Sequence, residues 1–283
     1  MSPLAITLAV VAAILVPPFV GGLLNGLDRR LTARLQGRFG PPVRQPFYDI
    51  IKLFSKSQIN TTRSQVVFVY GYLVLVIAAV ILFALKQDLL VLVLVLGAAN
   101  VLFVLAGFST RSPYSHIGAN RELLQMFAYE PILILTAVAV YIKTGSFLIS
   151  GITTPLLPSL WPVYIALVVA LITLMRKSPF DISACHHAHQ EIVRGIYTEF
   201  SGRSLAIIDL AHWYELALVL GVVALFWLPA IWPGILLALF SWFIVIIIDN
   251  ITARLTWSVM LRASWAIGII LPIANIVRLR FGG

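Results

Sequence analysis

Apolar residues form long runs along this chain, and polar residues gather in the stretches between them. Each run is continuous and about 20 residues long, which is the length a helix needs to cross roughly 30 Å of hydrocarbon. The strands of a membrane barrel would instead alternate over about ten residues. The pattern therefore predicts an all-α, polytopic membrane protein with about eight transmembrane helices. The predicted spans are 4–24, 66–85, 89–108, 122–142, 160–176, 205–228, 231–249 and 257–277.

The composition agrees with a membrane protein. The chain has 283 residues, of which 60% are hydrophobic and 11% are charged. A soluble domain carries about 25% charged residues, so this chain has too little polar surface for water. The run 3–24 lacks a basic segment before it and is too long for a signal peptide, so we expect it to be the first span. We expect one transmembrane domain over 1–283, with no obvious internal repeat.

The distribution of charge predicts the orientation. The net charge is +9, and sixteen of the twenty Lys and Arg residues lie in loops on one side of the predicted spans. By the positive-inside rule these loops are cytoplasmic, and both termini face outward. Orientation thus explains the positive charge, and we expect no nucleic acid as a partner. The single cysteine, Cys185, excludes an iron–sulfur cluster or zinc site built from this chain's thiolates alone.

Two predicted cytoplasmic loops, 25–65 and 176–204, are longer than a connection requires. The first begins with a candidate surface helix, in which Arg30, Arg34 and Arg38 form one stripe. Leu31, Leu35 and Phe39 form a second stripe, and such a helix can lie in the membrane interface and face anionic lipid. One interpretation is an orientation anchor. The other is a docking surface for a cytoplasmic partner, since a structured, partly apolar segment follows.

Ionisable residues inside a span are costly and mark either an ion path or a buried pair. Glu130 lies about 13 Å into the fourth span if that helix starts near Arg121. Pro131 follows it, which frees the carbonyl of Phe127 and kinks the helix. A buried carboxyl beside a kink is a candidate protonatable site. The alternative is a neutral glutamic acid that is hydrogen-bonded for packing.

The sixth span begins with three ionisable residues, Asp209, His212 and Glu215. Their i, i+3, i+6 spacing spreads them over about 120° of one helix, so they can line a single polar seam. Groups that both give and take protons can form a proton relay. His212 alone is equally well explained as an interfacial histidine. Asp249, at the end of the seventh span, is predicted to be a surface or cap residue.

Loop 176–204 holds the densest group of ionisable residues. The run Cys185-His186-His187-Ala188-His189 with Glu191 favours either metal binding or proton handling. A cysteine and histidines at i, i+3 and i+4 can share a helix face and bind a metal. Histidines suit proton entry at a membrane surface equally well. One thiol is a weak metal motif, and we predict no metal in this chain.

Three separated motifs resemble the core membrane subunit of respiratory complex I, which joins its peripheral and membrane arms. The first is Gln45-Pro46 with Asp49 and Lys52-Leu53, and the second is Arg121 with Gln125 and Tyr129-Glu130. The third runs from Ser178-Pro179-Phe180-Asp181 through Glu191 and Gly195 to Thr198-Glu199-Phe200-Ser201-Gly202. They occur in the expected order, and the resemblance covers essentially the whole chain.

Departures from that pattern indicate which branch of the family the chain resembles. Nine residues separate Asp181 from Glu191, whereas the quinone-reducing members are shorter there and richer in carboxylates. Ser57 follows Lys56 where those enzymes tend to have a glutamate. The His186–Glu191 run is similar to the membrane subunit of energy-converting (Ech-type) [NiFe] hydrogenases, which are related to formate hydrogenlyase. These departures put a quinone pocket in doubt.

The resemblance implies a non-catalytic subunit of a ferredoxin-dependent, hydrogen-evolving complex in a prokaryotic cytoplasmic membrane. It implies a [NiFe] centre and [4Fe-4S] clusters in hydrophilic partner subunits, no cofactor in this chain, and a neighbouring antiporter-like membrane subunit. The alternatives are a subunit of a quinone-reducing dehydrogenase and a stand-alone secondary transporter. The predicted proton or ion pathway comprises Glu130, Asp181, Glu191, Glu199, Asp209, His212 and Glu215. The predicted docking residues are Arg44, Gln45, Pro46, Asp49, Lys52, Arg121, Gln125, His186, His187 and His189.

Overall fold

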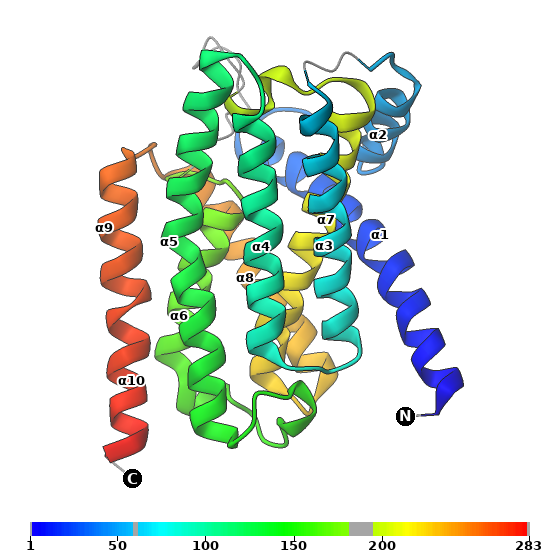
Figure 1. Ribbon diagram of the computed structural model, residues 1–283. Helices are drawn as coiled ribbons and strands as arrows, with labels where there is room; N and C mark the ends of the chain where they lie inside the picture. The colour runs from blue at the N-terminus through cyan, green and yellow to red at the C-terminus, as the bar shows by residue number, and fades with distance from the viewer. Residues whose placement is uncertain (1, 59–61, 181–194, 282–283) are drawn as a thin grey trace.

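The computed structural model describes residues 2–58, 62–180 and 195–281, and within these residues the chain is helical (Figure 1). The α-helices are α1 (Pro3–Leu35), α2 (Gln45–Ser55), α3 (Arg63–Ala84), α4 (Leu89–Phe108), α5 (Pro113–Thr144), α6 (Leu157–Leu174), α7 (Gly202–Ala224), α8 (Ile231–Ile251), α9 (Trp257–Gly268) and α10 (Ile270–Phe281). Short 3-10 helices are η1 (Ile149–Gly151), η2 (Gly195–Glu199) and η3 (Leu225–Trp227).

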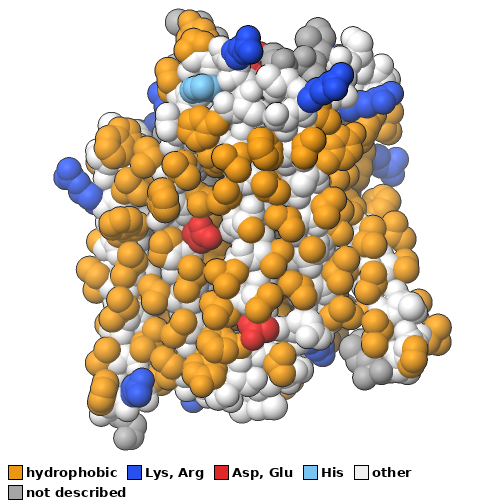
Figure 2. All heavy atoms as spheres, in the orientation of Figure 1, with side chains coloured by type: hydrophobic (Ala, Val, Ile, Leu, Met, Phe, Trp, Pro, Cys, Tyr) orange, Lys and Arg blue, Asp and Glu red, His pale blue; other side chains and the backbone are white. Residues whose placement is uncertain are grey.

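Eight helices in the described residues are long and apolar enough to cross a membrane, which confirms the predicted number of spans. The last span consists of α9 and α10, which are joined at Ile269. The two chain ends lie at the end of the bundle opposite α2 (Figure 1). Hydrophobic side chains cover most of the face in Figure 2, with basic side chains near its upper end. This surface is that of a multi-pass membrane protein.

Local sequence signals start and stop these helices. Asp88 caps α4, because its side chain accepts hydrogen bonds from the backbone N–H groups of Leu90 and Val91. Thr62 caps α3 in the same way by accepting from Gln65 N. Gly145 ends α5 in the left-handed conformation that glycine adopts readily. These signals fix the helix ends, and the apolar runs between them supply the packing surfaces.

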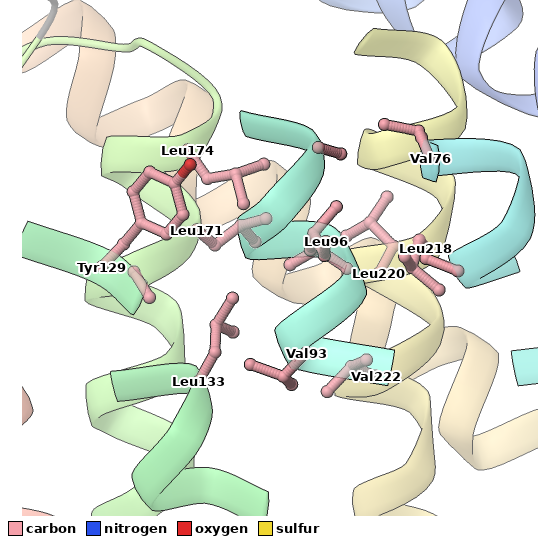
Figure 3. Close-up of a cluster of buried hydrophobic side chains, with 14 of the residues drawn as sticks. Val76, Val93, Leu96, Tyr129, Leu133, Leu171, Leu174, Leu218, Leu220 and Val222 are labelled. Atoms are coloured by element: carbon pink, nitrogen blue, oxygen red, sulfur yellow. The ribbon is translucent and has the colours of Figure 1, made fainter. Parts of the chain in front are cut away.

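The core lies where the middle helices meet. Figure 3 shows side chains from α3, α4, α5, α6 and α7 converging, among them Val76, Leu96, Leu133 and Leu171. In a bilayer the tails are as apolar as leucine, so close van der Waals packing holds such helices together. By contrast, α1 is exposed along much of its length, and only 11% of its most apolar window is buried.

The first span is longer than predicted. One helix, α1, continues from Pro3 to Leu35, so the separate surface helix predicted after residue 24 is wrong. Arg30 and Arg34 belong to α1, but Arg38 and Phe39 lie beyond its end. No proline interrupts residues 25–35, and the chain leaves the helix at Gly37, which has a φ of +68°. A helix of this length is about 50 Å long, so it extends past the hydrocarbon or tilts within it.

The fourth span is also longer, because α5 starts at Pro113 rather than near Arg121. Glu130 is therefore about 26 Å from the start of its helix, twice the predicted distance. The helix is continuous through Pro131. The carbonyl of Phe127, which Pro131 leaves without its helical donor, accepts a hydrogen bond from Trp265 Nε1 at 3.1 Å. The indole of α9 thus satisfies the backbone group that the proline freed.

Trp265→Phe should therefore lower the free energy of unfolding by about 0.6 kcal/mol, the average for an interhelical hydrogen bond in a membrane protein. The largest expected loss is about 1.7 kcal/mol. In a Pro131→Ala background the new backbone N–H can donate to Phe127 itself, so the same replacement should cost almost nothing. Unfolding in mixed detergent micelles, measured for the four members of this cycle, checks the coupling. Equal costs in both backgrounds would contradict it.

Candidate functional site

A buried carboxyl on α7 lies at the centre of the site. Glu215 is 2% exposed, and its Oε2 accepts a hydrogen bond from the Tyr72 hydroxyl on α3 at 3.1 Å. Asp209, His212 and Glu215 line one cavity of about 150 Å³. The three residues predicted to share one face of this helix thus form one wall of the cavity, as their i, i+3, i+6 spacing requires.

The cavity reaches from this wall to the elements at the α2 end of the bundle. Its other walls include Asn25 and Asp28 on α1, Asp49 on α2, Tyr197 on η2 and Trp242 on α8. Both Asn25 Oδ1 and Trp242 Nε1 are buried and have no hydrogen-bond partner among the described residues. A cavity of this volume with polar walls has room for a few water molecules, at roughly 30 Å³ each.

Four aromatic side chains pack against one another beside the cavity. The ring of Phe103 on α4 stacks on Tyr72 at 5.2 Å and meets His212 edge-on at 5.5 Å. Tyr197 lies at 5.8 Å from the same ring, and its hydroxyl is 3.5 Å from the imidazole nitrogens of His212. The rings thus pack beside Tyr72, which donates to Glu215, and Tyr197 and His212 add a hydroxyl and an imidazole to the cavity wall.

A buried ion pair lies next to this group. Arg176, just after α6, donates from Nη2 to Glu122 Oε1 at 2.6 Å and from Nε to Oε2 at 3.3 Å. Its side chain is 10% exposed and that of Glu122 is 4% exposed. Burial lowers the pKa of the Arg176 guanidinium, but the charge and hydrogen bonds of Glu122 outweigh burial and hold that pKa well above its ordinary value. Arg176 is therefore always a cation here.

The next residue forms a second set of ion pairs. Lys177 Nζ lies 2.7 Å from Asp28 Oδ2 on α1 and 3.0 Å from Asp249 Oδ2 on α8. The backbone N–H of Ser178 also donates to Asp249, at 2.9 Å. Burial lowers the pKa of Lys177, and the two carboxylates raise it by more, so the pKa lies above its ordinary value. One ammonium thus joins α1 and α8 to the segment after α6.

A further buried hydrogen bond lies between α4 and α5, where Asn100 Nδ2 donates to the Tyr129 hydroxyl at 2.9 Å. The next residue, Glu130, is half-buried, and its carboxyl occupies the space that a side chain at Gly97 would fill. Acidic side chains are visible within the hydrophobic face in Figure 2. Polar groups therefore extend from the α2 end of the bundle into its apolar interior.

Comparison with known proteins identifies the family of this chain. The model of a family described as NADH dehydrogenase matches residues 6–279. The chain belongs to the NADH dehydrogenase family. It is 33% identical over 228 residues to hydrogenase-4 component C of Escherichia coli K12, covering 74% of this chain and 69% of that protein. It is 30% identical over 284 residues to formate hydrogenlyase subunit 4 of the same organism, covering 87% and 90%.

One further relative and one solved structure extend the comparison. A subunit of the NADH-quinone oxidoreductase of Rhodospirillum rubrum is 28% identical over 265 residues, covering 84% of this chain and 78% of that protein. A chain of the membrane-bound sulfane sulfur reductase, an archaeal respiratory membrane complex, shares the fold with a TM-score of 0.82. That chain is 23% identical, and the match covers 97% of this chain and 99% of that one. The protein is therefore a membrane subunit of a multisubunit complex I-like, hydrogenase or other oxidoreductase complex.

Several residues that the sequence predicts to bind a partner subunit lie on or beside α2. Arg44 and Lys52 are exposed, whereas Pro46 is buried in the cavity wall. Asp49 pairs with Arg29 at 2.7 Å and accepts a hydrogen bond from Gln45 at 3.0 Å. Of the two predicted residues on α5, Arg121 is half-buried. Gln125 is 1% exposed and donates to the Phe180 carbonyl at 2.6 Å, so it holds the segment after α6.

Part of the predicted site lies outside the described residues, namely Asp181, Cys185, His186, His187, His189 and Glu191. Glu199 is half-buried in η2, where its carbonyl accepts a hydrogen bond from Gln65. Within the residues that the structure describes, no group of three or more His, Cys, Asp or Glu side chains is arranged to hold a metal ion. The described site is therefore one of carboxyl, hydroxyl, imidazole and guanidinium groups.

Sequence reasoning missed the two ion-pair sets. Glu122 and Asp28 were not singled out, and Arg176 and Lys177 were used only as loop charges. Asp249, predicted to be a surface or cap residue, is 17% exposed and bound to Lys177. The sequence carries one signal for them, because it has only 11 acidic residues. Acidic residues are rare in membrane proteins and usually pair with a cation, so each of the 11 was a candidate for a buried ion pair.

Proposed function

We propose that this chain is the membrane anchor and ion-translocation coupling subunit of a ferredoxin-dependent, hydrogen-evolving [NiFe] hydrogenase complex. The observation that carries the proposal is the cavity that leads from α1 and α2 to the buried carboxyl of Glu215. Such a route can transmit a change of charge from a docked partner into an apolar bundle. The similarity to hydrogenase-4 component C and formate hydrogenlyase subunit 4 supports the hydrogenase branch.

In this proposal the two long segments bind the hydrophilic subunits. Segment 25–65 contributes the end of α1 and the amphipathic helix α2, and segment 176–204 contributes η2 with the His186–Glu191 run. The [NiFe] centre and [4Fe-4S] clusters belong to those partners on the cytoplasmic side. The chain termini then face outward, and the chain alone evolves no hydrogen.

The relay is proposed to run from the docking end toward a neighbouring antiporter-like subunit. Asp181, Glu191 and Glu199 lie near the junction by their place in the chain. Asp209 and His212 follow on the cavity wall, and Glu215 and Glu130 carry the proton deeper. Tyr72 hydrogen-bonds Glu215 and keeps its carboxyl oriented toward α3. The sequence is compatible with either H⁺ or Na⁺ as the coupling ion, since carboxylates serve both.

A second candidate is the corresponding subunit of a quinone-reducing dehydrogenase. The similarity to the NADH-quinone oxidoreductase of Rhodospirillum rubrum favours it. The cavity weighs against it, because it measures about 150 Å³ and seven of its seventeen lining residues are charged. Organic ligands usually bind in mostly apolar pockets of about 300–1,000 Å³.

The proposal is tested on the mildly solubilised complex. It should contain nickel and iron–sulfur subunits and should evolve hydrogen from reduced ferredoxin. After reconstitution, Glu215→Gln and Glu130→Gln should each reduce ion translocation per hydrogen by about tenfold or more, because an amide neither binds nor releases the proton.

The matched control is Glu215→Asp, which retains a carboxyl and should keep part of the translocation. Quinone reduction without nickel would favour the second candidate. Full translocation in both glutamine variants would overturn the relay, whatever the electron acceptor.

A further inference from the structure

Arg176 has an unusual backbone and an unusual environment. Its φ is +52°, a conformation that residues other than glycine rarely adopt. Its guanidinium lies 5.7 Å from the centre of the Phe103 ring, which belongs to the aromatic side chains beside the cavity. Strained backbone persists where the surrounding structure holds it, and it is concentrated at functional positions.

Two carboxylates share the surroundings of this cation. Glu122 on α5 binds it through two hydrogen bonds, at 2.6 and 3.3 Å. Glu215 on α7 faces the same cavity as Arg176, and its charge helps to raise the pKa of the guanidinium. Glu215 accepts a hydrogen bond from the neutral Tyr72 hydroxyl, whereas Glu122 holds the full charge-assisted pair. One guanidinium therefore lies near two carboxylates that belong to different helices.

We propose that Arg176 is a shared cation that moves between Glu122 and Glu215 as the charge on Glu215 changes. When Glu215 is neutral, the guanidinium stays with Glu122. When Glu215 is ionised, it competes for the same five N–H donors, which can bridge two carboxylates. Arg176 is thus a positioning residue for Glu215, and its movement links the end of α6 to α5 and α7. This inference rests on the proposed function of Glu215 as a proton carrier.

The cavity holds further charged groups: Lys177 pairs with Asp28, Arg29 pairs with Asp49, and Asp209 lies on the α7 wall. Other titratable groups that face the guanidinium are Tyr129 on α5, Tyr72 on α3, Tyr197 on η2 and His212 on α7. These four groups are hydroxyls and an imidazole, so none of them is a carboxylate that could hold the guanidinium in place of Glu122 or Glu215. A buried cation with poor access to water stays with whichever carboxylate is charged.

The first test is the position of the guanidinium in the intact complex carrying Glu122→Gln, determined by electron cryo-microscopy. Without the Glu122 charge, Arg176 should lie within hydrogen-bond distance of the Glu215 carboxylate, roughly 2.7–2.9 Å. The control is Glu122→Asp, which keeps a charge on α5 and should keep the guanidinium there. An Arg176 side chain that remains at residue 122 in the glutamine variant, or that turns away from Glu215, would overturn the proposal.

The second test separates positioning from packing. Arg176→Gln leaves the buried Glu122 carboxylate without its cation, so it should lower the yield of assembled complex strongly. Glu122→Gln should lower that yield only slightly, because Arg176 can then pair with Glu215. The double variant removes both charges and should regain assembly. Its ion translocation per hydrogen should nevertheless remain about tenfold below that of the wild type, because Glu215 has lost its cation. Full recovery of translocation in the double variant would mean that Arg176 and Glu122 form only a structural contact, and that Arg176 does not position Glu215.

Failure of the proposed function would be visible separately. If Glu215→Gln leaves translocation intact, Glu215 carries no proton, and its part in the proposed relay is wrong. The position of Arg176 in the Glu122→Gln complex still tests the shared cation, because that measurement does not depend on pumping.

Discussion

Replacing Lys177 with methionine is expected to lower the free energy of unfolding by about 3–5 kcal/mol. The side chain fits by volume, but the ammonium that joins Asp28 to Asp249 is lost. The two aspartate side chains are 13% and 17% exposed, so each would keep a partly buried charge without its cation. Unfolding of the purified chain in mixed detergent micelles gives the free energy directly.

A solvent-exposed pair provides the control. Arg29 and Asp49 are 2.7 Å apart, but their side chains are 44% and 38% exposed, so Arg29→Ala should cost less than about 1 kcal/mol. Adding Asp28→Asn and Asp249→Asn to Lys177→Met should recover much of the loss, because no charge is then left unpaired. A Lys177→Met variant no less stable than Arg29→Ala would contradict the ion-pair assignment.

The raised pKa of Lys177 gives this stabilisation a pH dependence. The contribution is fully present below the unfolded-state pKa of lysine, roughly 10.4. It is lost as the pH rises through the higher folded-state pKa, when the ammonium gives up its proton. The wild type should therefore lose stability at strongly alkaline pH, and Lys177→Met should lack that step.

The spans were predictable because each depends on a local property of the chain. About 20 consecutive apolar residues cross the hydrocarbon wherever they occur, and all eight predicted spans appear. The cavity wall formed by Asp209, His212 and Glu215 was predictable for a similar reason, since helical spacing alone puts the three on neighbouring positions.

The ion pairs were not predictable, because they join residues far apart in the chain. Arg176 and Glu122 are separated by 54 positions, and Lys177 and Asp28 by 149. Both cations lie in a loop, where hydropathy predicts only an orientation signal. Which carboxylate each one meets depends on how α1, α5 and α8 pack. The full length of α1 was not predicted for another reason. Polar residues after position 24 end the apolar run, but the helix continues through them to Leu35.

Gly118→Ala is expected to lower the free energy of unfolding by about 3 kcal/mol or more, at the upper end for overpacking. A Cβ atom there would lie 2.1 Å from Ile196 N and 2.4 Å from Gly195 C, which are backbone atoms of η2. Because η2 carries Tyr197 in the cavity wall, the same replacement should also displace that hydroxyl from His212.

Gly71→Ala on α3 is the matched control for Gly118→Ala. Its Cβ would meet only the end of the Leu102 side chain, at 2.9 Å, and a side-chain end can turn aside. The replacement also gains helix propensity, up to about 1 kcal/mol. Gly118→Ala should therefore destabilise the chain while Gly71→Ala leaves it unchanged or more stable. Similar unfolding free energies for the two variants in detergent would mean that η2 does not pack on α5 at Gly118. In that case Tyr197 would not belong to the cavity wall.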